Sequence, residues 1–155
     1  MSFDINQEAV LTALQEQLSC AQAPTPDLMA EVIARACPRT QARSPAGTTR
    51  IGRLIESGAV AEAAFALLEL ELPGWKLRRL VHEDGEWICS LSKHTELPDW
   101  LDDTAEARHE TLALAIVAAF LEAQSRAGDA DRVSVPTVPQ EPRATDCALC
   151  CDNFA

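Results

Sequence analysis

Three of the six cysteines in this 155-residue chain lie together near its last residue, in the sequence CALCC. Cys147 and Cys150 have the C-x-x-C spacing that lets two thiolates bind one soft metal ion, Zn(II) or Cu(I), and Cys151 adds a third thiolate. A tetrahedral zinc site needs a fourth ligand. Cys37, Cys20, a histidine or a second subunit would have to supply it. The cysteines are therefore a candidate metal site, with a tail of unbound thiols or a substrate for a modifying enzyme as the alternatives.

Histidines and carboxylates form a second candidate group, which supplies the atoms for a metal site or an acid-base pair. Its members are His82, His94 and His109 with Glu83, Asp99, Asp102, Asp103 and Glu110. His109-Glu110 begins like the zinc-protease helix H-E-x-x-H, but position 113 is alanine, so the second metal ligand is missing. The sequence contains no nucleophile elbow, phosphate-binding loop or dinucleotide-binding glycine pattern. The sequence therefore points to no catalytic residue.

Two tryptophans are candidates for contact with a partner. Trp100 lies in the acidic segment HTELPDWLDDTAE, and Trp87 lies in a segment with the alternation of a strand. Tryptophan is enriched among the residues that dominate binding energy at interfaces. Trp100 is thus either an interface anchor or a lid packed over the core.

Charge and composition limit the classes of partner. The formal net charge of -11 disfavours binding to nucleic-acid phosphates and to anionic lipids. The N-terminus lacks the pattern of a secretory signal, and the longest apolar run, Leu112 to Leu121, is about half of the ~20 residues that a bilayer requires. The expected location is the cytoplasm, where the cysteines would be thiols. We expect a protein partner, and neither nucleic acid nor a membrane.

The elements that position these residues begin with a predicted pair of helices in residues 1–37. Asn6 is suited to cap the first helix, and Thr25 followed by Pro26 is suited to begin the second. Residues 38–49 carry arginine, proline and glycine without an acid, which predicts a solvated linker. Two further helical patterns then follow, before the chain reaches the Pro-Gly pair at 73–74.

The middle of the chain predicts a β-hairpin. Residues 75–82 and 86–93 flank Asp84-Gly85, a strong signal for a two-residue turn. The turn sets the register, in which Val81 lies opposite Ile88 and His82 lies opposite Trp87.

Both faces of this hairpin are apolar, which predicts that both are covered. One face would carry Trp75, Leu77, Val81 and Ile88, and the other Leu80, Trp87, Cys89 and Leu91. Because an isolated hairpin is marginal in water, further strands or a second subunit should extend it. A homodimer through the hairpin edge is therefore expected.

The last predicted helix runs from near Glu106 to Ala127 and ends at Gly128. Asp102, Asp103 and Thr104 would stabilise its N-terminus. Its centre, LALAIVAAFL, is apolar on all sides, which is typical of a buried helix. Residues 128–155 contain prolines and the three cysteines with few large apolar groups, and we expect a disordered tail.

Residues 50–124 contain LELELPGWKLRRL, DGEWICSLSK, LPDWLDDT and LALAIVAAFLEA. In these motifs the chain resembles an uncharacterised family of small bacterial proteins. The hairpin and the apolar helix also give it a weaker similarity to the phage-type α-β-α sandwich domain. The resemblance implies a fold and a bacterial or phage origin, and it supplies no activity.

Together these patterns predict an α+β fold. A helix, β-hairpin, helix core (α-β-β-α) at residues 50–127 would follow the N-terminal helical pair and the linker. The expected function is a non-enzymatic protein-interaction or assembly module. A soft-metal-binding or thiol-handling protein acting through the cysteine tail is the first alternative, and a small hydrolase or metalloenzyme that uses the histidines and the acidic segment is the second.

Overall fold

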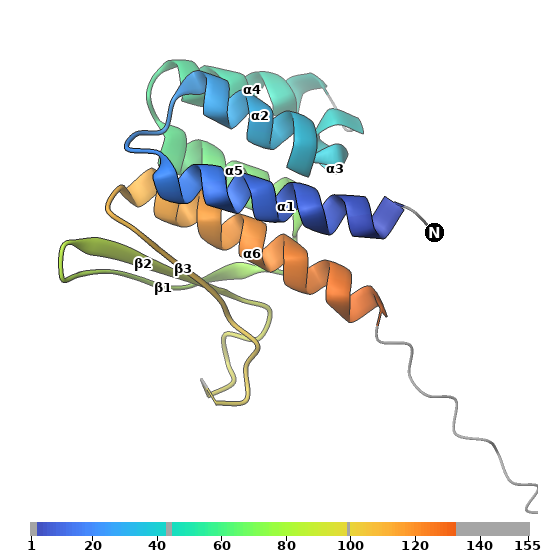
Figure 1. The fold of residues 1–155 in the computed structure, drawn as a ribbon, viewed down its shortest axis with the longest axis vertical. Coiled ribbons are helices and arrows are strands. Elements are labelled where there is room, and N and C mark those ends of the chain that lie inside the picture. The colour runs from blue at the N-terminus through green and yellow to red at the C-terminus, as the bar shows by residue number, and fades with distance from the viewer. Residues whose placement is uncertain (1–2, 43–44, 99, 133–155) are drawn as a thin grey trace, which may run out of the picture.

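The computed structural model describes residues 3–42, 45–98 and 100–132, which form an α+β fold with a three-stranded antiparallel sheet (Figure 1). In chain order the elements are α1 (Phe3–Cys20), α2 (Pro26–Ala36), α3 (Pro38–Ala42), α4 (Pro45–Glu56), α5 (Val60–Glu71), β1 (Lys76–Glu83), β2 (Glu86–Ser92), β3 (Ala105–His109) and α6 (Leu112–Arg132). The strand order in the sheet is β1-β2-β3.

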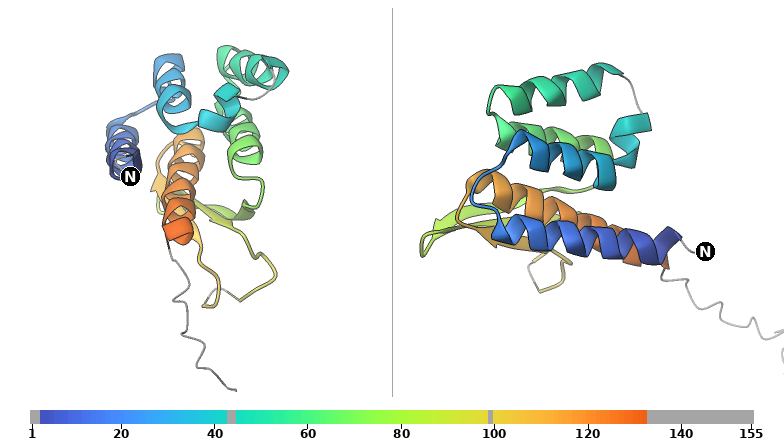
Figure 2. Two further views of the ribbon diagram at one scale, coloured as in Figure 1. Left: turned by 90° about the vertical axis from the view of Figure 1, so that its right-hand side faces the viewer. Right: turned by 45° about the horizontal axis from the view of Figure 1, so that its top comes forward.

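The helices form two layers on one side of the sheet. Figure 2 (left) shows α6 between α1 and α5 in the layer next to the strands, with α2, α3 and α4 stacked above. In that layer α6 packs against α1, α5, β2 and β3. This central position explains why the first half of α6, LALAIVAAFL, is apolar on all sides, since it packs against both helices and strands.

One continuous core joins the N-terminal helices to the rest of the chain. Leu14 and Leu18 of α1 are fully buried, and they belong to the same cluster as Leu114 and Phe120 of α6. A hydrogen bond of 3.1 Å from the Gln15 side chain to the Glu122 carboxylate also joins the two helices. The helical pair is therefore packed on the core.

The predicted N-terminal cap of α2 is confirmed, whereas the predicted cap of α1 is wrong. The Thr25 hydroxyl accepts a hydrogen bond of 3.2 Å from the Leu28 N–H, and Pro26 occupies the first turn, as predicted. Asn6 does not cap α1, because the helix already begins at Phe3.

The stretch predicted as a solvated linker is largely helical, because it contains α3 and the start of α4. The physical reason is a tertiary contact. The buried Glu71 carboxylate accepts a hydrogen bond of 2.5 Å from the Thr40 N–H in α3, which is a group that a helix N-terminus leaves unpaired. This contact holds the short helix against α5.

The hairpin forms in the predicted register, with Val81 opposite Ile88 and His82 opposite Trp87. Asp84 and Gly85 both have positive φ, 54° and 83°, which identifies a type I′ turn. A bulge between Leu77 and Arg79 interrupts the first half of β1. It also places Leu77 opposite Leu91, so the prediction that put Leu77 on the face of Ile88 is wrong.

Residues 105–109 form a third strand where the sequence predicts the start of the last helix. The helix α6 begins at Leu112 and continues past Gly128 to Arg132, so both predicted ends were wrong. Asp102, Asp103 and Thr104 therefore precede β3 and do not cap a helix. Pairing of β3 with β2 overrides the weak helical pattern of this segment.

Both faces of β2 are buried, as the prediction of cover on both sides of the hairpin requires, whereas β1 is exposed or half-buried. Cys89 and Leu91 are fully buried on the face that packs against α6, with Leu80 and Trp87 partly buried beside them. All the helices in Figure 2 lie on that side. On the other face, Ile88, Ser90 and Ser92 of β2 are buried as well, and the Ser92 hydroxyl donates to the Asp102 carboxylate in the segment between β2 and β3.

Candidate interaction surface

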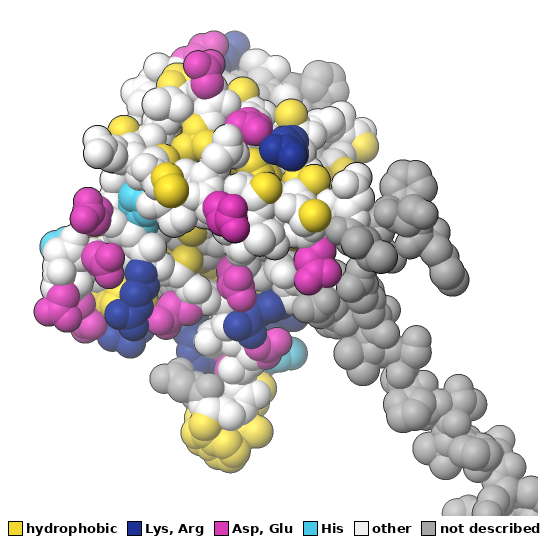
Figure 3. Space-filling model, viewed as in Figure 1, with side chains coloured by type: hydrophobic (Ala, Val, Ile, Leu, Met, Phe, Trp, Pro, Cys, Tyr) yellow, Lys and Arg dark blue, Asp and Glu magenta, His cyan; other side chains and the backbone are white. Residues whose placement is uncertain are grey.

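An apolar tip projects from the loop between β2 and β3. This projecting loop comprises residues 93–98 and 100–104. Trp100 is 81% exposed and Leu101 is 56% exposed, which makes them the two most exposed large hydrophobic residues in the described chain. Figure 3 shows hydrophobic side chains gathered at the end of this loop, away from the body of the molecule. Contiguous exposed apolar side chains are a recognised feature of interaction surfaces.

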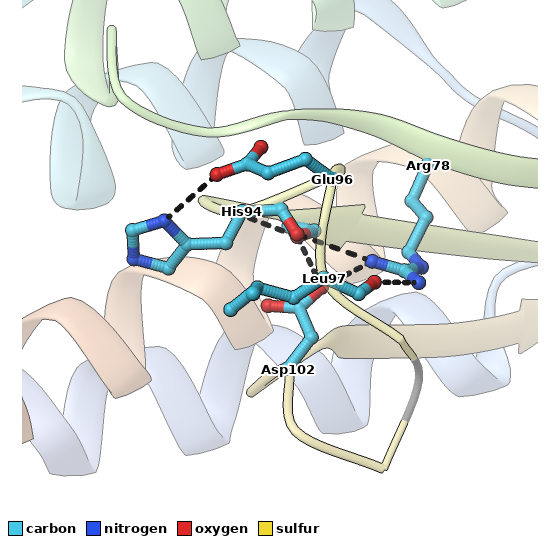
Figure 4. Close-up of polar contacts among 6 residues, drawn as sticks. Arg78, His94, Glu96, Leu97 and Asp102 are labelled. Carbon is cyan, nitrogen blue, oxygen red and sulfur yellow. Dashed lines mark hydrogen bonds and ion pairs between the residues drawn. The ribbon is translucent and has the colours of Figure 1, made fainter.

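The arginine at position 78 anchors the loop to β1 (Figure 4). Its guanidinium donates to the Asp102 carboxylate at 2.6 Å, to the Leu97 carbonyl at 2.7 Å and to the His94 carbonyl at 3.3 Å. The planar fork of arginine suits such simultaneous bonds to several oxygens. One side chain thus holds the beginning, the middle and the end of the loop.

A second set of bonds closes the base of the loop. The Ser92 hydroxyl donates to the Asp102 carboxylate and accepts a bond of 2.9 Å from the His94 N–H. The side chain of Asp102 is 1% exposed and that of Arg78 is 16% exposed, so water screens this ion pair little. Asp103 lies on the surface and pairs with Arg126 of α6.

The loop therefore displays an apolar tip on a fixed base. An interface residue that is held in place before binding loses less conformational entropy when a partner docks. Glu96 and Asp103 are exposed near the base, so the apolar tip has acidic flanks.

Trp87, the other predicted contact residue, lies on the helix-covered side of the hairpin. Its ring is partly buried against the core, and its centroid lies 4.9 Å from that of the His82 ring. The structure does not bring Trp87 to the tip of the projecting loop. Trp100, by contrast, is exposed and is no lid over the core.

The three histidines are in separate places. His82 is exposed on β1, His94 lies 3.6 Å from Glu96 in the projecting loop, and His109 ends β3. In the described part of the chain, no three His, Cys, Asp or Glu side chains are close enough to hold a metal ion. The predicted grouping of histidines and carboxylates is not formed there.

His109 has a structural role. Its Nδ1 accepts a hydrogen bond of 2.9 Å from the Thr111 N–H, which leaves the proton on Nε2, and Nε2 lies 3.1 Å from the Leu18 carbonyl of α1. The Thr111 hydroxyl donates to the Gln22 carbonyl at 3.1 Å. These bonds fix the corner between β3 and α6 to the end of α1.

The predicted metal ligands Cys147, Cys150 and Cys151 lie outside the described residues. The structure does remove one proposed fourth ligand, because Cys37 is fully buried in the core. Burial, with a smaller contribution from Glu71, raises the pKa of its thiol far above the ordinary value. A fully buried thiol that resists ionisation is a poor metal ligand.

The described surface also has a shallow groove of about 500 Å³ between α5 and the start of β1. Its lining is Phe65, Leu68, Glu69, Pro73, Trp75, Lys76 and Leu77. Histidine, cysteine and hydroxyl groups are absent from this lining. Its ionisable side chains are Glu69 and Lys76.

Sequence reasoning missed Arg78 and Asp102 as the residues that position the loop. Arg78 has no role predicted from the sequence, and Asp102 is assigned there to a helix end. Their partnership joins residues 24 positions apart. The available signal was weak: an arginine in a strand and an aspartate after a turn, with nothing local to link them.

Comparison of the chain with models of protein families, with curated proteins and with solved structures finds no match in any of the three. The resemblance to a family of small bacterial proteins therefore stays an expectation. Each helix among the described residues is too short or too polar to cross a bilayer.

Proposed function

We propose that the chain is a protein-interaction module that binds a protein partner through Trp100 and Leu101. The observation that carries the proposal is the combination of exposure at the tip and burial at the base of the projecting loop. Trp100 is 81% exposed, whereas the Asp102 side chain that fixes the loop is 1% exposed. Burying this apolar tip against a partner is favourable.

Charge supports a protein as the partner class. A net charge of -11 disfavours nucleic acid and anionic lipid, and the exposed acids beside the tip add to that local repulsion. A cytoplasmic location belongs to the same proposal, and the free thiols of Cys20, Cys37 and Cys89 support it. The partner would present an apolar pocket with basic groups at its rim.

The test is affinity capture from extracts of the cells that produce the protein. Wild-type full-length chain is compared with the double variant Trp100→Ala, Leu101→Ala. We expect the double variant to lose specific partners, with binding reduced at least tenfold, because removing hot-spot residues costs about 2 kcal/mol or more. Its thermal unfolding should match that of the wild type, since both side chains are exposed.

The matched control is Leu77→Ala, which removes an exposed apolar side chain from β1 and leaves the loop intact. This variant should capture the same proteins as the wild type. Equal capture by all three forms would contradict the proposal.

A further inference from the structure

The sheet has two edges, and the one formed by β1 is open beyond the helices. In Figure 1 the β1–β2 turn extends past the ends of the helical layers. β1 pairs with β2, and none of the described helices packs extensively against it. An edge strand presents unpaired backbone N–H and C=O groups that can pair with another strand.

The bulge divides this edge into two unequal halves. The half around Lys76 and Leu77 is irregular, and a bulge and a lysine are both features that protect an edge from pairing. The half from Arg79 to Glu83 is regular and lacks both features. Its Leu80 and Val81 side chains are only partly buried.

The turn determines which backbone groups of the regular half point outward. Residues that flank a two-residue turn form a hydrogen-bonded pair, and such pairs alternate with non-bonded pairs along the strands. Glu83 and Glu86 flank the turn, so Val81 and Arg79 bond to β2. The N–H and C=O groups of Leu80 and His82 consequently point away from β2.

The charges of residues 79–83 are complementary to those of the same residues in an antiparallel copy. We propose that residues 79–83 pair antiparallel with the same residues of a second copy, with Val81 on the two-fold axis. Arg79 then lies opposite the partner's Glu83, and Leu80 lies opposite the partner's His82. The outward N–H and C=O groups of Leu80 and His82 bond across this axis, and the two sheets become one.

Other registers are less favourable. An axis at Leu80 would place Arg79 opposite the partner's Val81, without an opposite charge. An axis at Arg79 would place two arginines face to face, which is destabilising. Within one chain Arg79 and Glu83 already lie 3.3 Å apart with both side chains about half exposed. In the dimer, the ion pairs between Arg79 and the partner's Glu83 favour the register with Val81 on the axis. Hydrogen bonds between the backbones and burial of apolar side chains provide the affinity.

The test uses charge reversal in the full-length chain. Native mass spectrometry and light scattering should give twice the monomer mass of 16.8 kDa for the wild type as concentration rises. Arg79→Glu alone and Glu83→Arg alone should each weaken association about tenfold or more, because like charges then face each other across the axis. A mixture of the two variants should restore a heterodimer, since one copy then carries only acids at these positions and the other only arginines.

Two further variants distinguish loss of the dimer from loss of folding and from dimerisation through another surface. His82→Pro removes an N–H that points away from β2, so it should abolish the dimer and leave the circular dichroism spectrum unchanged. Trp100→Ala should leave the dimer intact. A wild type that stays monomeric at the highest soluble concentration overturns the proposal, as does a dimer that Trp100→Ala removes and Arg79→Glu does not.

Discussion

Two cysteine side chains in the core, Cys37 and Cys89, are held as neutral thiols. Burial, with a smaller contribution from Glu106, raises the pKa of Cys89 from 9.0 to about 12. Burial acts on Cys37 in the same direction. A thiol that resists ionisation is a poor nucleophile and a poor metal ligand, so these residues act by packing.

The raised pKa predicts a loss of stability in alkali. Above about pH 9 the unfolded chain releases the Cys89 proton and the folded chain retains it, so the free energy of unfolding falls as pH rises toward 12. One such group contributes a slope of up to about 1.4 kcal/mol per pH unit. Cys89→Ala should therefore give a shallower slope than the wild type in urea unfolding between about pH 9 and 10.5.

The chain contains no tyrosine, whose hydroxyl would also titrate in this pH range. Cys20→Ala, at the exposed end of α1, is the matched control and should keep the wild-type slope. Parallel slopes for Cys89→Ala and the wild type would show that the Cys89 thiol does not resist ionisation.

Among the elements, the projecting loop depends most on side chains that are distant in sequence. Arg78 of β1, Ser92 of β2 and Asp102 of the loop form one buried polar group. Removing one partner of such a group leaves a buried charge without a counter-ion. This costs more free energy than the intact ion pair contributes when it is compared with apolar residues in the same place. The neighbouring carboxylate at Asp103 is 76% exposed and contributes far less.

These neighbours give a matched pair of variants. Asp102→Asn should lower the free energy of unfolding by about 2 kcal/mol, since Arg78 keeps its bonds to the two loop carbonyls but loses its counter-ion. Asp103→Asn should change it by less than about 0.5 kcal/mol. Chemical denaturation measures both, and equal costs for the two variants would refute the role of Asp102 as the anchor.

The anchor also connects stability to the proposed binding. Asp102→Asn leaves Trp100 and Leu101 in place but frees the base of the loop. We therefore expect this variant to bind the partner more weakly than Asp103→Asn does, because a freed tip must be ordered on docking.

At the scale of the whole molecule, the N-terminal helices and the hairpin share one core. Leu14 and Leu18 of α1 are fully buried in the cluster that contains α6 and the inner face of β2. His109 and Thr111 tie α1 to the corner before α6. The described residues should therefore unfold together.

Leu14→Ala tests this cooperation. We expect a loss of 2–5 kcal/mol in the free energy of unfolding, roughly the cost of a cavity in a packed core. Circular dichroism of the helices and tryptophan fluorescence near the sheet should report one coincident transition. A helical transition that precedes the fluorescence change would mean that the N-terminal pair is a separate unit.

Much of the fold was determined by local sequence alone. Asp84-Gly85 set the hairpin and its register, because few residues other than glycine, asparagine and aspartate accept the positive φ of a type I′ turn. Thr25-Pro26 set the start of α2, and the apolar run from residue 112 set a buried helix. The exposed Trp100 was named as a candidate, but its environment was not.

Tertiary structure decided β3, α3 and the anchored loop. The segment AEARH has no β-branched residue, so only pairing with β2 makes it a strand. α3 is held by Glu71, and the loop is held by Arg78, through contacts between residues 24 and more positions apart. No periodicity encodes such pairs, since each side chain gains its partner only when the chain has folded around the core.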